Sequence, residues 1–383
     1  MLPPLVEPGP PLDRDQRRRY ARHLLIPALG DAGQRRLLAA RVCVVGAGGL
    51  GSPALLYLAA AGVGHLTIVD DDAVDLTNLQ RQVIHDDAAV GTPKAASAAA
   101  RLRALNPAIE VVERPLRLTR ANAAAVFRGH DLVLDGTDNF PTRYLVNDTC
   151  AELGLPYVWA SVYRTQAQVS VFWKRPPAGA VGVDLRDLFP VAPDPATVPS
   201  CGDAGVLGAL VGQVGSLMAT EAIKLICGVG EPLLGRVAFL DVLEGRQVEI
   251  PLRPRVEPAP PEPPAADDAA SCPAPGAPVG AVTPRALAAE LASAAPPIVV
   301  DVREPGEVAL VAIPGTVHVP LADFLASPPA YPPDADVVVH CKTGPRAERA
   351  AAALAASGHR RVRTLTGGVL AWIDEVDPTL TRY

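Results

Sequence analysis

The sequence lacks a field of positive charge. Its 383 residues include 35 Lys and Arg against 41 Asp and Glu, which gives a net charge of −6 at pH 7. Proteins that bind nucleic acid or an anionic membrane surface usually carry clustered basic residues, so this balance argues against both as partners.

The N-terminal segment also lacks the apolar core of a signal peptide, because MLPPLVEPGPPLDRDQRRRY is rich in proline and charge. The longest uncharged stretch, residues 204–220, contains four glycines and a glutamine. We therefore expect a buried helix there rather than a membrane span, and a cytoplasmic location for the chain.

The six cysteines form no C-x-x-C pair, so the sequence indicates neither a disulfide framework nor a zinc site. Cys43, Cys150 and Cys227 lie within apolar patterns and are predicted to be core residues. Cys201 and Cys341 lie beside polar loop residues and are considered below.

Alternating apolar runs and helical stretches predict an α/β fold. Between residues 41 and 163, runs such as VCVVGA, HLTIVD and DLVLDGTD alternate with stretches such as KAASAAARLRAL, a pattern typical of a mainly parallel sheet with helices on its faces. Three later runs, AQVSVFW, RVAFLDV and RQVEIPL, predict added antiparallel strands that make the sheet mixed.

A stretch rich in proline and alanine then separates two domains. We expect a first domain over residues 12–252, an extended linker over 253–280 and a smaller α/β domain over 281–383, where apolar runs alternate with helices again.

The glycine-rich segment of residues 44–62, VVGAGGLGSPALLYLAAAG, predicts a nucleotide site. Gly46, Gly48 and Gly51 fit the G-x-G-x-x-G fingerprint, and Asp70 ends the next apolar run, where a ribose-binding acid belongs. Glycines let the N–H groups of a helix N-terminus approach the phosphates of any nucleotide. On the fingerprint alone, a dinucleotide and another nucleotide are equally open.

Polar residues outside the fingerprint bear on that choice. A cation at a helix start suits phosphate oxygens, and side chains at the carboxyl edge of a sheet lie where ligands of open α/β folds bind. Each residue also has a structural reading, as a solvated charge for Arg81 and Lys94 or as a helix cap for Asp138. The set comprises Asn78, Gln80, Arg81, Lys94, Asp138 and Asn139.

Five segments in order, GAGGLG, VDDDAVDLTNLQRQ, GTPK, DGTDN and VPSCGDAGVLG, resemble the adenylyltransferases that activate sulfur-carrier proteins. These are the MoeB and ThiF-like relatives of ubiquitin-activating enzymes, and the resemblance covers roughly residues 12–250. It implies a Rossmann-like ATP-binding domain that uses ATP and Mg²⁺. It also implies that the C-terminal Gly-Gly carboxylate of a ubiquitin-like carrier attacks the α-phosphate, while cations and Mg²⁺ stabilise the charge that develops.

The resemblance also implies roles for single residues. Asp138 would place Mg²⁺, Arg81 would act catalytically on the phosphates, and Arg22 in RRRYARH would reach the ATP of a partner subunit, which implies a homodimer. The nucleotide-binding set comprises Gly48, Gly49, Asp70, Asn78, Gln80, Arg81, Lys94, Asp138 and Asn139.

Cys201 precedes an apolar helix, where a thiol has a lowered pKa and more thiolate. By resemblance it matches a loop cysteine proposed to attack the activated carbonyl or an acyl persulfide. A buried structural thiol is the alternative.

Cys341 ends the apolar run DVVVHC and opens a loop of Lys342, Thr343, Gly344, Pro345 and Arg346. A bowl of backbone N–H groups and two cations would favour a thiolate and hold a sulfane sulfur on it. Four residues separate Cys341 from Arg346, whereas cysteine phosphatases have five. The loop, together with DVREPGEVALVAIPGTVHVPL and TLTGGVLAW, resembles rhodanese over about residues 280–380; a catalytically empty module is the alternative.

The sequence departs from many adenylyltransferase relatives in one respect. Those relatives bind zinc through two C-x-x-C pairs, whereas here the first region reads VDLRDLFP and the linker keeps only Cys272. Four ligands are needed for such a site, so we expect no zinc.

These features predict an adenylyltransferase and sulfurtransferase in one chain. A persulfide on Cys341, charged by a sulfur donor, would deliver sulfur to the adenylated carrier and give a thiocarboxylate for molybdenum-cofactor, thiamine, cysteine or other thio-compound synthesis. The linker would raise the effective concentration of one active site at the other. The alternatives are an NAD-dependent oxidoreductase and a non-catalytic adaptor for a ubiquitin-like protein.

Overall fold

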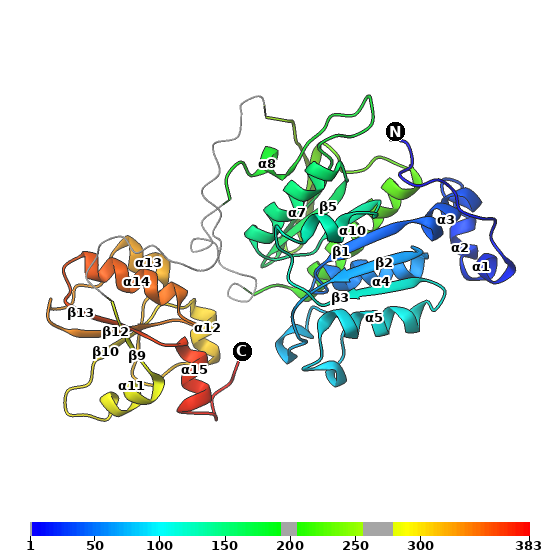
Figure 1. The fold of residues 1–383 in the computed structure, drawn as a ribbon. Helices are drawn as coiled ribbons and strands as arrows, with labels where there is room; N and C mark the ends of the chain where they lie inside the picture. The colour runs from blue at the N-terminus through cyan, green and yellow to red at the C-terminus, as the bar shows by residue number, and fades with distance from the viewer. Residues whose placement is uncertain (1, 193–204, 256–278) are drawn as a thin grey trace. The chain divides into compact units, whose positions relative to one another are not determined.

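The computed structural model describes residues 2–192, 205–255 and 279–383 and divides into two compact units, Met1–Glu262 and Pro263–Tyr383. Cys201 and Cys272 lie outside the described residues. Figure 1 shows the helices and strands of both units.

The first unit is built on one mixed sheet, which confirms the α/β prediction. Its strand order is β3-β2-β1-β4-β5-β6-β7-β8. The strands from β3 to β5 pair in parallel, and β6, β7 and β8 add in antiparallel fashion. The bounds are β1 (Arg41–Val45), β2 (His65–Val69), β3 (Glu110–Arg114), β4 (Leu132–Asp135), β5 (Tyr157–Tyr163), β6 (Gln166–Phe172), β7 (Arg236–Asp241) and β8 (Arg246–Pro251).

Helices bury both faces of this sheet, as the alternation along β1 shows. Val42 and Val44 point into a core formed with α3 (Gly30–Ala39), α4 (Gly51–Ala61), α5 (Lys94–Leu105) and α10 (Gly208–Cys227). Cys43 and Val45 point into the opposite core, formed with α6 (Ala123–Phe127), α7 (Phe140–Leu153) and α8 (Leu185–Leu188). The central strands are therefore buried on both sides, as parallel strands usually are.

Helix α10 corresponds to the uncharged stretch of the sequence. It is the one helix among the described residues that is long and apolar enough to cross a membrane, and 61% of its most apolar window is buried within the protein. It packs against α4 and β5 in the core, as expected for a buried helix.

Three N-terminal helices precede the sheet: α1 (Arg14–Arg19), α2 (Ala21–Leu24) and α3. Asp13 caps α1 through a capping box with Gln16. The buried side chain of Tyr20 anchors the segment, because its hydroxyl accepts a hydrogen bond of 3.0 Å from Asn106 Nδ2.

The second unit is a smaller, all-parallel sheet of order β11-β10-β12-β13-β9. Helices α13 and α14 cover one face, and α11 and α15 cover the other. The bounds are β9 (Gly280–Val282), α11 (Pro284–Leu291), β10 (Ile298–Asp301), α12 (Pro305–Leu310), β11 (Val317–His318), α13 (Leu321–Ala326), β12 (Asp336–His340), α14 (Pro345–Ala356), β13 (Arg361–Leu365) and α15 (Gly368–Glu375).

Candidate functional site

A cavity of about 350 Å³ opens in the first unit beyond the carboxyl ends of β1, β2 and β4. This is the edge at which open α/β sheets bind ligands. Seven of the residues predicted from the sequence line it: Gly48, Gly49, Asp70, Arg81, Lys94, Asp138 and Asn139.

The glycine loop adopts a conformation that side chains would prevent. Gly46 has φ +92°, in the left-handed region that favours glycine. A Cβ on Gly51 would lie 1.9 Å from the Gly46 carbonyl oxygen, so the first turn of α4 could not close against the loop. The fingerprint glycines thus bring the backbone of the loop to the cavity.

Two side chains, the buried His85 and the half-buried Asp70, fix the loop at Ala47. The Ala47 N–H donates to Asp70 Oδ2 at 2.8 Å, and the Ala47 carbonyl accepts a hydrogen bond from His85 Nε2 at 3.0 Å. Because Nε2 must then carry the proton, His85 Nδ1 accepts from the Ser97 hydroxyl at 2.9 Å. Burial lowers the pKa of His85 and raises the pKa of Asp70, whose carboxylate lines the cavity.

Lys94 begins α5 and is buried, so it is not a solvated surface charge. Its ammonium lies 2.7 Å from a carboxylate oxygen of Asp72, and its N–H donates to the Asp72 carbonyl at 2.8 Å. Asp72 also lines the cavity. A fixed cation therefore stands at one wall of the cavity.

The loop after β4 carries Asp138, whose side chain is exposed at the cavity. Asn139, rather than Asp138, caps α7, since its Oδ1 accepts from the Thr142 N–H at 3.0 Å. Arg143 of α7 fixes the loop, because its Nε and Nη2 donate to the Thr137 carbonyl at 3.3 and 3.0 Å. Its guanidinium lies 5.9 Å from the ring centroid of Trp159.

Three of the predicted residues, Asn78, Gln80 and Arg22, do not line the cavity. Arg81 lines the cavity and donates from Nη1 to the Thr77 carbonyl at 3.0 Å, but Asn78 and Gln80 are not among the lining residues. Arg22 is exposed on α2 and does not line the cavity either. Cys201 lies outside the described residues.

The second candidate site surrounds Cys341, which follows β12 and is 1% exposed. Its Sγ accepts a hydrogen bond of 3.1 Å from the N–H of Gly344. The loop leads into α14, which begins at Pro345 and carries Arg346 in its first turn. The loop thus directs a backbone N–H at the sulfur, as the sequence predicts for a site that holds an anionic sulfur.

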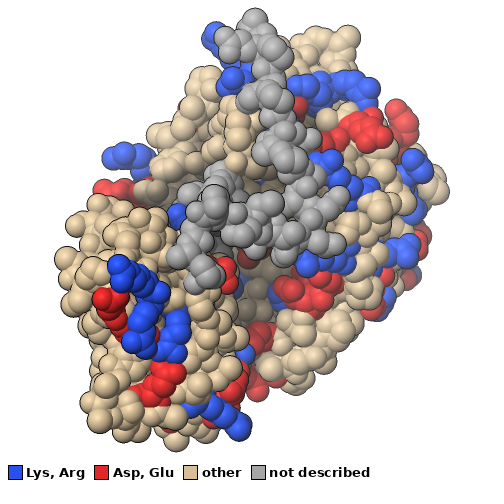
Figure 2. All heavy atoms as spheres, turned by 60° about the vertical axis from the view of Figure 1, so that its left-hand side comes forward, with Lys and Arg blue, Asp and Glu red and all other residues tan. Residues whose placement is uncertain are grey.

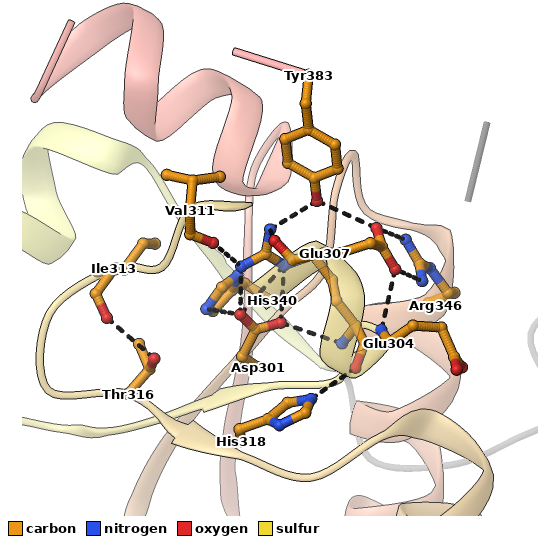
Figure 3. Close-up of polar contacts among 11 residues, drawn as sticks. Asp301, Glu304, Glu307, Val311, Ile313, Thr316, His318, His340, Arg346 and Tyr383 are labelled. Carbon is orange, nitrogen blue, oxygen red and sulfur yellow. Dashed lines mark hydrogen bonds and ion pairs between the residues drawn. The ribbon is translucent and has the colours of Figure 1, made fainter. Parts of the chain in front are cut away.

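A buried polar network supports this loop from the side of α12 (Figure 3). Asp301 and Arg303 form a fully buried ion pair, and the side-chain hydrogen bond from Arg303 helps to hold the pKa of Asp301 below its ordinary value against the effect of burial. Glu307 accepts two hydrogen bonds from Arg346, at 2.6 and 2.8 Å. The charge of Arg346 is therefore balanced by a neighbouring carboxylate, which leaves a weaker positive field at the loop than two unpaired cations would supply.

Within the described ranges, no group of three or more His, Cys, Asp and Glu side chains is arranged to hold a metal ion. In the segment VDLRDLFP, Asp184 caps α8 and forms an ion pair of 2.9 Å with Lys174.

On the face shown in Figure 2, the described Lys and Arg side chains lie among Asp and Glu side chains rather than in one basic surface.

Sequence reasoning missed several residues that these sites use. His85, Asp72 and Arg143 support the cavity of the first unit, and Glu307 and Tyr383 support the Cys341 loop. The only sequence signal for them was their position within or near the recognised segments, because most of them act through a partner distant in the sequence, as His85 does through Ala47.

Two family models match the chain. The ThiF family model matches residues 20–261, and the rhodanese-like domain model matches residues 283–375. The first match contains the cavity of the first unit, and the second contains Cys341.

Curated relatives match over one or both units. "Probable adenylyltransferase/sulfurtransferase MoeZ" of Mycobacterium tuberculosis is 47% identical over 395 residues, which cover 100% of this chain and 99% of the relative. "Adenylyltransferase and sulfurtransferase MOCS3" of Mus musculus is 37% identical, over 100% of this chain and 90% of the relative. "Sulfur carrier protein adenylyltransferase" of Thermus thermophilus is 49% identical, over 62% and 88%.

Among solved structures, E. coli MccB matches 65% of this chain and 73% of its own, with a TM-score of 0.55 and 23% sequence identity. At that identity the match supports the fold alone.

Proposed function

The chain belongs to the ThiF family and carries a rhodanese-like domain, and from this premise we propose a two-step reaction for it. The chain is an adenylyltransferase and sulfurtransferase that acts on sulfur carrier proteins. In the first step, the first unit adenylates the C-terminal glycine of a ubiquitin-like carrier. In the second, a persulfide on Cys341 supplies the sulfur.

One observation carries this proposal: a single cavity is lined by the glycine loop, by the cations Arg81 and Lys94 and by the Asp138 carboxylate. A nicotinamide dinucleotide would bind at the loop, but hydride transfer does not require the charges of Arg81, Lys94 and Asp138. A non-catalytic adaptor would have no need to keep them. A nucleoside triphosphate uses all of them.

In adenylation, a carboxylate oxygen of the carrier bonds to the α-phosphorus of ATP and the bond to pyrophosphate breaks. Negative charge moves onto the phosphate oxygens, and Lys94, Arg81 and the loop N–H groups stabilise it there. Asp138 suits Mg²⁺, which commonly binds one or two protein carboxylates together with substrate phosphates. When bound, Mg²⁺ would add positive charge beside the leaving pyrophosphate.

We assign Arg22 to the nucleotide site of a partner subunit. Its exposure on α2, away from the lining of the cavity in its own chain, supports a role in a homodimer. The proposed setting is the cytoplasm, where thiols such as Cys341 stay reduced.

Sulfur transfer begins at Cys341. A sulfane-sulfur donor converts its thiolate to a persulfide, whose terminal sulfur attacks the acyl adenylate and displaces AMP. The product is an acyl disulfide between the carrier and Cys341. Attack by the Cys201 thiolate on the Cys341 sulfur would release the thiocarboxylate and leave a Cys201–Cys341 disulfide, which an external thiol reduces.

The two steps can be separated by experiment. Exchange of labelled pyrophosphate into ATP, measured with purified Gly-Gly carriers, reports adenylation alone. We expect carrier-dependent exchange that Cys341→Ala leaves intact and Lys94→Ala abolishes. Exchange without any carrier requirement, or reduction of a nicotinamide cofactor by the chain, would contradict the proposal.

A further inference from the structure

Tyr383, the last residue of the sequence, contacts Lys342 directly and is linked to Arg346 through the Glu307 carboxylate. The ammonium of Lys342 lies 4.6 Å from the ring centroid of Tyr383. The Tyr383 hydroxyl donates to Glu307 Oε1 at 3.1 Å, and that carboxylate binds Arg346. In Figure 3 the hydroxyl of Tyr383 points toward Glu307, which in turn contacts Arg346.

The hydroxyl is fixed from a second side. Arg303 Nη1 donates to it at 2.6 Å, while the rest of the Arg303 guanidinium is held by Asp301. Burial raises the pKa of Tyr383, so the hydroxyl keeps its proton and can donate to Glu307. The ring is thereby held between a buried ion pair and the loop.

This arrangement sets the charge around Cys341. Glu307 is 5% exposed and accepts from Arg346, Tyr383 and the Glu304 N–H, so its carboxylate has little freedom to move. The Arg346–Glu307 pair is close to neutral as a unit. The position of the Lys342 ammonium over the Tyr383 ring limits where its charge can lie.

We propose that Tyr383 is a positioning residue of the sulfur site, which holds Lys342 and Arg346 where an anionic sulfur donor approaches Cys341. This inference rests on the proposed role of Cys341 as the persulfide carrier. Tyr383 itself does not touch the reacting sulfur; it acts through the two cations.

The test uses the full chain with thiosulfate as donor and cyanide as acceptor. The Cys341 thiolate takes the outer sulfur of thiosulfate and releases sulfite; cyanide then takes that sulfur as thiocyanate and restores the thiolate. Tyr383→Leu removes the ring and hydroxyl, and Tyr383→Phe removes the hydroxyl alone. Tyr331→Leu is the matched control. Tyr331 lies beside His359, and the two residues precede β12 and β13. They therefore lie at the amino edge of the sheet, whereas the Cys341 loop follows β12 at the carboxyl edge.

We expect Tyr383→Leu to raise the KM for thiosulfate about tenfold while kcat changes less than about threefold, because the cations act on approach of the anion. Tyr383→Phe keeps the ring under Lys342 and should raise the KM about threefold. The control should stay within about twofold of wild type.

A double-mutant cycle separates positioning from a general loss of structure. On a Lys342→Met background, Tyr383→Leu should raise the KM by no more than about threefold, since much of its effect passes through Lys342. An equal tenfold rise on both backgrounds would overturn the proposal.

Two further outcomes distinguish the inference from its premise. If Tyr383→Leu and Tyr383→Phe both match wild type while Cys341→Ala forms no thiocyanate, the positioning role is wrong and the sulfur-transfer function stands. If wild type itself forms no more thiocyanate than Cys341→Ala, both are wrong.

Discussion

The ammonium of Lys94 and the carboxylate of Asp72 lie 2.7 Å apart at the wall of the nucleotide cavity. The side chain of Lys94 is 8% exposed, whereas that of Asp72 is 66% exposed. An exposed carboxylate thus orients a buried cation. Both residues also bond through the backbone, which ties the start of α5 to the end of β2.

The first prediction follows from this pair. Asp72→Ala should lower kcat/KM for ATP about threefold to tenfold, because Lys94 loses a charge-assisted hydrogen bond that orients it. Asp71→Ala is the control, since Asp71 lines the same cavity, and it should stay close to wild type. Carrier-dependent pyrophosphate exchange measures both. A lower KM for ATP in Asp72→Ala would mean that Asp72 competes with the phosphates, contrary to this account.

The second prediction concerns His85. His85→Leu removes the shorter of the two hydrogen bonds to the Ala47 carbonyl and leaves only the 3.4 Å bond from the Ser52 hydroxyl. The glycine loop is then held less firmly, and the KM for ATP should rise about tenfold. His85→Gln can both donate and accept, and should restore the KM to within about threefold of wild type.

A half-buried histidine, His130, provides the control for that experiment. His130 precedes β4, at the amino edge of the sheet away from the cavity, and contacts the Thr67 hydroxyl at 2.8 Å. His130→Leu should leave the KM for ATP unchanged. An equal rise in both leucine variants would show that the effect comes from general destabilisation.

The third prediction tests the partner-subunit role of Arg22. Arg22→Ala and Lys94→Ala should each be nearly inactive, but a 1:1 mixture with exchanged subunits should recover about a quarter of wild-type activity, because half of the subunits enter heterodimers with one intact site. Lys94→Ala mixed with Asp138→Ala should recover nothing. The same absence of recovery in the Arg22 mixture would place Arg22 outside a shared site.

The fourth prediction is a pH dependence in the second unit. Burial lowers the pKa of His340 to about 4. Between pH 6.5 and 4 the unfolded chain therefore binds a proton that the native state does not. The free energy of unfolding thus decreases as the pH is lowered, by about 2 kcal/mol from pH 7 to pH 5. The lowered pKa of Asp301 costs stability only below about pH 4.

Hydrogen exchange of the β12 amides in the full chain measures this free energy. His340→Leu removes the titrating group. Neither ring nitrogen of His340 has a hydrogen-bond partner among the described residues, although Nε2 lies 3.6 Å from Asp301 Oδ2. The variant should lose clearly less stability than wild type over the same pH interval. Parallel pH profiles for the two proteins would rule out His340 as the cause.

The sequence predicted the framework because the relevant signals are local. The strands, their helices and the glycine loop follow from patterns within about twenty residues, and Asp70, Lys94 and Asp138 each lie just beyond a strand or at a helix start. These residues all line the cavity. The helices α1 to α3 and strand β9 carry weaker patterns and were not predicted.

The supporting residues could not be found in this way. His85 and Ala47 are 38 positions apart, and Arg303 and Tyr383 are 80 apart, so nothing in either local segment indicates the contact. Conversely, Asn78 and Gln80 lie in a recognised segment, yet the 3-10 turn η1 (Leu76–Asn78) does not bring them to the lining of the cavity. The roles of Cys201 and of Mg²⁺ at Asp138 remain predictions.

The most direct test of the whole account is the mass of the carrier. Candidate carriers ending in Gly-Gly are incubated with the full chain, ATP, Mg²⁺ and thiosulfate with a reducing thiol, and their intact masses are measured. Replacement of one carboxylate oxygen by sulfur should add about 16 Da, with no gain for Cys341→Ala. Absence of the gain in every carrier, or an equal gain with Cys341→Ala, would contradict the account.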